Sequence, residues 1–189
     1  CRAMAPAFEQ AAQQLEPQHS NIITIGPDGL VQPASMPKAK KPKSGGVDGM
    51  FLPQEVAYGG GEAAGTIVIN TQERFLYLVG ADGMARSYGV GVGKAGFEWS
   101  GDAVIGMKRK WPRWLPPLEM VYRDENAAKW ANGMPGGPEN PLGARALYLY
   151  ANGEDTLYRI HGTNDPKSIG KALSSGCIRM LNQDVVDLF

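Results

Sequence analysis

The chain has 189 residues, enough for one ordinary domain with an extension but too few for two large domains. Lys and Arg together number 19, as do Asp and Glu, and this zero formal net charge argues against a nucleic-acid-binding protein, which would usually carry a strongly basic face. The 25 glycines and 14 prolines, with only short apolar runs between them, indicate a turn-rich, mainly β domain and no membrane-spanning helix.

The N-terminal part differs in composition from the rest. Residues 33–49 read PASMPKAKKPKSGGVDG, in which Pro, Lys, Ser and Gly dominate, as is typical of a flexible linker. Its lysines could contact an anionic envelope polymer, although a solvated tether explains them better. The chain begins with Cys1, which could be the acylated residue of a bacterial lipoprotein, although a plain fragment boundary is the simpler account. We expect an extension and linker over residues 1–50 and a folded domain over 51–189.

Short β-rich runs follow from Gly65. The turn Ala81-Asp82-Gly83 predicts a hairpin, and a turn over residues 151–155 predicts a second hairpin that ends at His161. The strands expected around these turns cover residues 66–70, 74–79, 84–92, 144–150 and 156–161.

Two helices and one long loop complete the expected elements. Pro166 after Asp165 predicts a short helix over 166–173, and Asn182 is expected to cap a second helix. Residues 94–143 read as a long irregular region that contains all four tryptophans, of which Trp111, Trp114 and Trp130 lie close to its prolines and glycines. These rings either pack a satellite core or contact a substrate, since long structured loops are often lids or binding loops.

The segment HGTNDPKSIGKALSSGCIRM, residues 161–180, holds the strongest signal for chemistry. Gly176 permits a tight turn before Cys177, and Arg179 and an imidazolium at His161 would both favour the thiolate. Cys177 could instead simply fill a core, because free cysteines are often buried. A disulfide to Cys1 would consume the nucleophile, so we expect none in the active protein.

Two other kinds of site are excluded. Residues 91–96, GVGKAG, match a dinucleotide-binding glycine pattern, but FEWSGD follows without helical periodicity, so a strand end and turn are expected there. Two histidines and two cysteines scattered along the chain make no metal-ligand cluster, and no cofactor is expected.

The residues IHGTN (160–164) and SSGCIRM (174–180), preceded by PGGPENPLGARALYLY (135–150), closely resemble the bacterial L,D-transpeptidase catalytic domain of the YkuD type. The similarity covers about residues 51–189. It implies a β-sandwich of mixed sheets with a few short helices and a groove under a long active-site loop. It also implies a place in the bacterial periplasm or cell envelope.

The resemblance also implies residue roles. Cys177 matches the acylated nucleophile, His161 its base and Arg179 the arginine that follows the nucleophile, while Gly176 precedes it in the motif. Substrate contacts are expected from Ser174, Ser175, Gly162, Thr163, Asn164, Trp111 and Trp114.

The implied reaction acts on peptidoglycan stem peptides. Cys177 would attack the carbonyl between the third residue and the terminal D-Ala, with the oxyanion held by the N–H groups of Gly176 and Cys177. Transfer to an amine of another stem would give a 3-3 cross-link, and transfer to an envelope protein would anchor it. Transfer to water would make an L,D-carboxypeptidase. A non-catalytic peptidoglycan-binding module is the remaining alternative, although binding alone needs no nucleophile.

The chain departs from the family pattern at two places. Many members have histidine where this chain has Ser175, so the group that orients His161 is expected to be a backbone carbonyl near Gly162 or Thr163. Family domains usually continue into a further strand after the last helix, whereas this sequence stops at Phe189.

Overall fold

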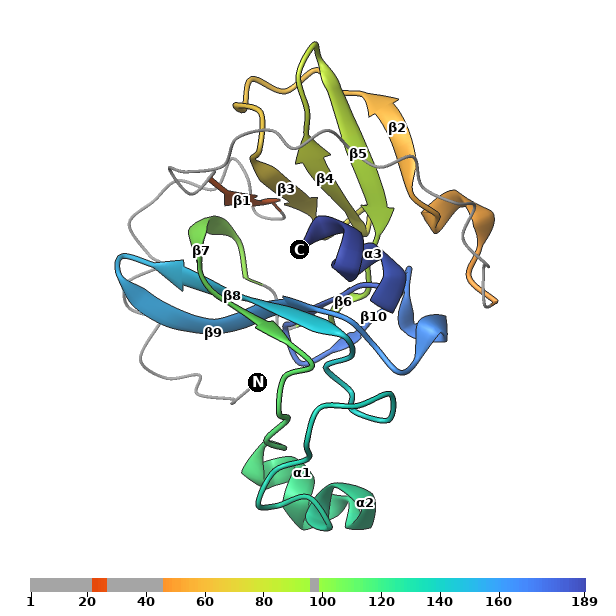
Figure 1. Ribbon diagram of the computed structural model, residues 1–189, viewed down its shortest axis with the longest axis vertical. Helices are drawn as coiled ribbons and strands as arrows, with labels where there is room; N and C mark the ends of the chain where they lie inside the picture. Colours follow the sequence, from red (N-terminus) through yellow and green to blue (C-terminus); the bar gives the residue numbers. More distant parts are fainter. Residues whose placement is uncertain (1–21, 27–45, 96–98) are drawn as a thin grey trace.

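The computed structural model describes residues 22–26, 46–95 and 99–189. Nine strands form one mixed sheet in the order β11-β9-β8-β7-β1-β3-β4-β5-β2, and β6 pairs with β10 in a small second sheet. Figure 1 shows β2 to β5 above, β7 to β9 below, and α3 between these two groups. The expected mainly β fold with mixed sheets and a few short helices is confirmed.

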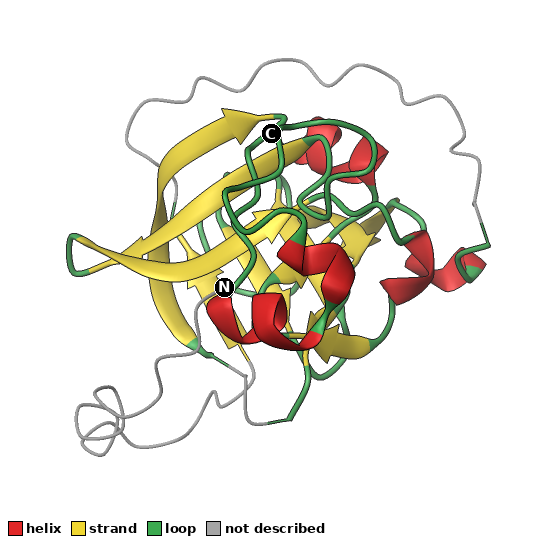
Figure 2. Cartoon of the chain, turned by 90° about the horizontal axis from the view of Figure 1, so that it is seen from below, coloured by secondary structure: helices red, strands yellow, loops and turns green. Residues whose placement is uncertain are grey.

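The strands are short except for three. Their bounds are β1 Ile22–Ile25, β2 Gln54–Ala57, β3 Ile67–Asn70, β4 Phe75–Val79, β5 Met84–Gly89, β6 Val92–Gly93, β7 Gly101–Lys110, β8 Arg145–Ala151, β9 Glu154–His161, β10 Ala172–Ser174 and β11 Ile178–Arg179. The helices are α1 Leu118–Arg123, α2 Glu125–Ala128 and α3 Asn182–Leu188, with 3₁₀ helices η2 Gly49–Phe51 and η3 Pro166–Ser168. In Figure 2 the long strands curve along one side of the molecule.

The core lies where the two groups of strands face each other. Fully buried side chains from both groups and from α3 form one cluster, and each such aliphatic side chain stabilises the fold by about 1.5–3 kcal/mol. Its members include Ile69, Leu76, Tyr88, Leu147, Leu149, Ile160, Ile178 and Val185.

Both predicted hairpins are confirmed. Asp82 and Gly83 between β4 and β5 have φ of 61° and 70°, and Asn152 and Gly153 between β8 and β9 have φ of 52° and 79°. Two successive positive φ values are the geometry that favours Asn-Gly and Asp-Gly in hairpin turns. The second hairpin is tighter than expected, because β9 begins at Glu154.

Tertiary pairing overrides several local expectations. Within residues 94–143, expected to be irregular, Gly101–Lys110 form the ten-residue strand β7. Within residues 1–50, Ile22–Ile25 form β1, which lies between β3 and β7 and buries Ile23 and Ile25. Cys1, with its possible lipid anchor, and the linker lysines lie outside the described residues.

The expectations for the C-terminal helices need correction. Residues 166–173 do not form one helix: η3 ends at Ser168, Gly170 has φ of 77°, and Ala172–Ser174 pair with β6. The second helix exists as α3, but Asn182 is its first residue rather than its cap, and Leu181 occupies the cap position without a side-chain hydrogen bond.

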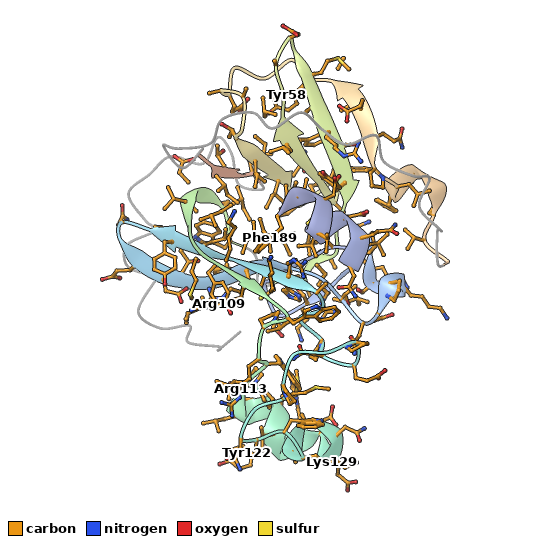
Figure 3. All side chains as sticks on the ribbon, viewed as in Figure 1. Tyr58, Arg109, Arg113, Tyr122, Lys129 and Phe189 are labelled. Carbon is orange, nitrogen blue, oxygen red and sulfur yellow. The ribbon has the colours of Figure 1, made fainter. Side chains whose placement is uncertain are left out.

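A projecting part of the chain, residues 111–143, leaves β7 and returns to β8, and we call it the arm. It carries α1 and α2 at the bottom of Figure 1, and Figure 3 labels Arg113, Tyr122 and Lys129 on it. Its outer residues are exposed, with Tyr122 at 85%.

Candidate active site

Strand pairing brings the two ends of segment 161–180 together. β11 runs parallel to the end of β9, with Ile178 opposite Ile160 and Arg179 opposite His161. The N–H of Met180 donates to the carbonyl oxygen of His161 over 2.8 Å. Because paired residues of neighbouring strands share a face, Arg179 and His161 lie on the same face of the sheet, and Cys177 immediately precedes β11.

His161 is buried at 4% exposure and lies next to one backbone acceptor. Its Nδ1 is 2.5 Å from the carbonyl oxygen of Gly162. A carbonyl can only accept, so Nδ1 carries the proton and Nε2 keeps its lone pair. The orienting contact thus comes from a backbone carbonyl at one of the two expected positions.

The imidazole of His161 is neutral near pH 7. Burial lowers the pKa of His161 to about 4; the Gly162 carbonyl opposes this shift, while the charges of Arg179 and Arg159 add to it. The expectation that an imidazolium would favour the Cys177 thiolate is therefore wrong for this structure. The geometry instead suits His161 to accept a proton.

Ser174 braces the loop that carries Cys177. Its Oγ donates to the carbonyl oxygen of Cys177 over 2.6 Å and accepts from the N–H of Gly176 over 3.2 Å. Gly176 has φ of 108°, a conformation that favours glycine. The N–H of Gly176, which was expected to bind the oxyanion, is thus hydrogen-bonded to Ser174. Ser174 is buried, whereas Ser175 is exposed.

Cys177 is disulfide-bonded in this structure. The only other cysteine in the sequence, Cys1, lies outside the described residues. The expectation that the active protein has no disulfide at Cys177 stays a prediction. Because a disulfide sulfur is not a thiolate nucleophile, reaction at Cys177 requires prior reduction.

The residues after His161 shape a turn and attach it to the arm. Thr163 is buried, and its Oγ1 accepts from the N–H of Asp165 over 3.0 Å. The side-chain amide of Asn164 donates to the carbonyl oxygen of Glu139 over 2.8 Å. The contacts described for Thr163 and Asn164 are therefore made within the protein. Their expected contacts with substrate remain predictions.

Arg179 is partly buried beside the site. Burial lowers the pKa of its guanidinium, and the charge of Asp165 opposes that shift. The side chain remains a cation at neutral pH, because an arginine loses its charge only far above that range. A fixed positive charge therefore lies near His161 and the Cys177 loop.

A cavity of about 410 Å³ adjoins the nucleophile loop. Gly176 and Ile178, the two neighbours of Cys177, line it, and Gln72, Arg74 and Trp99 contribute from other segments. These three residues were not predicted from the sequence, because no local pattern links them to residues 174–178. The volume of the cavity lies in the range of small-ligand pockets.

The arm is organised by a buried asparagine that was not predicted as a site residue. Asn140 is fully buried, and its side-chain NH₂ donates to the carbonyl oxygens of Pro112 over 3.0 Å, Pro135 over 3.0 Å and Met134 over 3.3 Å. Its Oδ1 accepts from the N–H of Leu142 over 2.8 Å. The prolines around Asn140 were a usable signal, because they remove N–H donors and leave carbonyls that need a partner.

The two tryptophans expected to bind substrate lie at the base of the arm. The N–H of Trp111 donates to the carbonyl of Ala144 over 2.9 Å, and Trp114 pairs with Met134 through two backbone hydrogen bonds. The cavity next to the Cys177 loop is lined by neither ring. Trp111 is 45% exposed, so its contact with substrate stays a prediction.

The described part of the chain holds neither a metal-ligand cluster nor a helix able to cross a membrane. No three or more His, Cys, Asp or Glu side chains in it are placed to hold a metal ion. No helix in it combines the length and apolar character needed to span a membrane.

Comparison with known proteins identifies the family. The model of the YkuD L,D-transpeptidase catalytic domain matches residues 64–189. The probable L,D-transpeptidase ErfK/SrfK of Escherichia coli K12 is 35% identical over 155 residues, which is 78% of this chain and 46% of that protein. The putative L,D-transpeptidase YkuD of Bacillus subtilis 168 is 56% identical over 51 residues, which is 27% of this chain and 29% of that protein. The chain thus spans about half the length of the ErfK/SrfK protein.

A solved structure is also similar. A Brucella melitensis protein described as a probable carnitine operon oxidoreductase matches with a TM-score of 0.55 and 50% identity, over 77% of this chain and 92% of that one. That description differs from the names of the curated relatives, which agree with the family model. Residues 64–189, which the family model matches, contain both His161 and Cys177. The chain therefore belongs to the YkuD family of L,D-transpeptidase catalytic domains.

Proposed function

We propose that reduced Cys177 is the nucleophile of an L,D-transpeptidase reaction on peptidoglycan stem peptides. The sulfur attacks the carbonyl between the third residue of a stem tetrapeptide and its terminal D-Ala. A carbon–sulfur bond forms, the amide carbon–nitrogen bond breaks, and D-Ala leaves. The proton of the thiol passes to Nε2 of His161 and then to the departing amine.

The second half of the reaction reverses these roles. An acceptor amine attacks the thioester carbonyl, and His161 takes a proton from that amine. The new amide forms as the sulfur leaves, and the sulfur regains its proton. An amine of another stem gives a 3-3 cross-link, an amine of an envelope protein gives an anchored protein, and water gives free tripeptide.

One observation carries this proposal. His161 lies in register with Arg179, two residues from Cys177, and its Nδ1 is held by the Gly162 carbonyl in the tautomer that a general base needs. A pKa of about 4 leaves the imidazole unprotonated over the physiological range. The arrangement supports a Cys–His acyl transfer in which the base is neutral at the start.

The positive charge of Arg179 supports an anionic peptide as substrate. This charge acts on His161, and it can also stabilise negative charge that develops at the site. Arg74 lines the neighbouring cavity together with Gly176 and Ile178, whereas Cys177 and His161 do not line it. A stem-peptide substrate would be met in the periplasm or cell envelope of a bacterium.

Intact-mass spectrometry of the reduced protein tests the reaction. Incubation with a disaccharide-tetrapeptide should add the mass of the acyl disaccharide-tripeptide to the wild type. Cys177→Ala and the disulfide-bonded protein should gain nothing. Cross-linked dimer among the products identifies transfer, and free tripeptide identifies hydrolysis. A reduced wild-type protein that stays unmodified while binding sacculi would refute the enzyme and support a binding module.

A further inference from the structure

We infer that Asn182 is a positioning residue for His161, because its side chain holds the backbone at Ala144 beside Gly162, whose carbonyl group orients the imidazole. The inference rests on the proposed function in taking His161 as the base. It concerns a residue that touches neither the imidazole nor the Cys177 loop in any hydrogen bond described above.

The side chain of Asn182 serves a distant segment. Its Oδ1 accepts from the N–H of Ala144 over 2.8 Å, across 38 residues of sequence. Asn182 begins α3, yet no side-chain hydrogen bond caps that helix at its N-cap residue Leu181. The contact therefore joins α3 to the start of β8 instead of stabilising the helix end.

Two glycines make room for this contact. A Cβ placed on Gly162 would lie 2.1 Å from Oδ1 of Asn182 and 3.0 Å from the nitrogen of Ala144. A Cβ on Gly143 would lie 2.2 Å from the same Oδ1 and 2.6 Å from the carbonyl carbon of Gly162. Real side chains do not approach so closely, so three segments meet at a point that only glycine permits.

Gly162 links this junction to the imidazole. Its carbonyl accepts from Nδ1 of His161 over 2.5 Å, and its N–H donates to the carbonyl of Arg145 over 3.0 Å. A displacement of Ala144 would therefore shift the acceptor that keeps the proton on Nδ1. The proton would then distribute between Nδ1 and Nε2, and the Nε2 tautomer cannot act as the base.

The same junction receives both ends of the arm. The carbonyl of Ala144 accepts from the N–H of Trp111 over 2.9 Å, and the N–H of Gly143 donates to the carbonyl of Asn140 over 2.9 Å. Asn182 thus lies where α3, the arm and the turn after His161 meet. Loss of its acceptor should alter His161 more than it alters the distant core.

The test compares Asn182→Leu, which removes the acceptor at similar size, with Asn182→Asp, which keeps one. Gln183→Leu, on the exposed neighbour in α3, is the matched control. Each reduced variant is assayed for the rate of acyl-enzyme formation with the disaccharide-tetrapeptide and for thermal unfolding. Nitrogen-15 NMR of the imidazole, in a His19→Gln background that leaves one histidine, reports the tautomer of His161.

We expect Asn182→Leu to form acyl-enzyme about 10- to 100-fold more slowly, the range caused by small misplacements of reacting groups. Its His161 should lose the pure Nδ1–H tautomer, while Asn182→Asp and Gln183→Leu keep it and react within about threefold of wild type. Wild-type rate and tautomer in Asn182→Leu would overturn the inference and leave the proposed function standing, even if the unfolding temperature falls. If no protein forms acyl-enzyme, the proposed function fails, and the NMR result alone decides the positioning role.

Discussion

Removing one atom, the hydroxyl oxygen of Ser174, tests whether its two hydrogen bonds stabilise the loop that carries Cys177. Ser174→Ala deletes the Oγ that donates to the Cys177 carbonyl over 2.6 Å and accepts from the Gly176 N–H over 3.2 Å. Ser174 is 2% exposed, so water does not readily replace the lost hydroxyl. The exposed neighbour Ser175 offers the matched control, because Ser175→Ala is the same chemical change one residue away.

The expected cost follows from these two hydrogen bonds. The buried N–H of Gly176 loses its acceptor, which costs about 1–3 kcal/mol, and the hydrogen bond to the Cys177 carbonyl contributes about 0.5–1.5 kcal/mol net. Together they predict a loss of about 2–4 kcal/mol in the free energy of unfolding, allowing for relaxation of the loop. For a chain of this size, a loss of about 3 kcal/mol lowers the unfolding temperature by roughly 6–12 °C.

Urea unfolding of the reduced proteins measures this difference, and the rate of acyl-enzyme formation reports the loop itself. Ser174→Ala should be less stable and should acylate more slowly, because the loop no longer holds Cys177 in one position. Ser175→Ala should match the wild type in both measurements. If Ser174→Ala loses less than about 0.5 kcal/mol in the free energy of unfolding and keeps the wild-type acylation rate, the two hydrogen bonds of Ser174 do not stabilise the loop.

Three further changes probe buried polar groups. Burial lowers the pKa of His161 from 6.5 to about 4, so the unfolded chain binds more protons than the folded protein between these pH values. The free energy of unfolding should therefore fall as the pH drops from 6.5 to about 4. A titration midpoint of His161 at pH 6 or above, measured by NMR, would contradict this prediction. Burial raises the pKa of Asp184 from 3.8 to about 7, so the folded protein binds more protons in that range and stability falls as the pH rises through it. Asp184→Asn should therefore stabilise the protein more at pH 8 than at pH 5 in urea unfolding, and equal effects would exclude charge as the cause. Asn140→Asp places a carboxylate against three carbonyl oxygens and should destabilise the folded arm by about 3 kcal/mol or more. A protease should then cleave this variant within residues 111–143 before it cleaves the rest of the chain. Asn132→Asp, at an exposed position of the arm, is the control and should resist the protease as the wild type does.

Local sequence determined those parts of the protein that depend on neighbouring residues. Asp82-Gly83 and Asn152-Gly153 adopt the positive φ values of hairpin turns, so both hairpins were predictable. The spacing and identity of the residues around His161 and Cys177 were enough to indicate the family, which the comparison over residues 64–189 confirmed. The 25 glycines and 14 prolines, with only short apolar runs between them, likewise indicated a mainly β domain.

Only the tertiary structure decided which strands pair and which groups hold the site residues in place. Ile22–Ile25 become a strand because β3 and β7 supply partners on both sides, and Ala172–Ser174 leave the helical path because β6 pairs with them. Burial keeps His161 neutral near pH 7, which the residue type alone does not determine. The N–H of Gly176, expected to bind the oxyanion, instead donates to the hydroxyl oxygen of Ser174. Hydrogen-bond partners, solvent exclusion and pKa values arise from contacts between segments distant along the chain, and such contacts are not written in any local pattern.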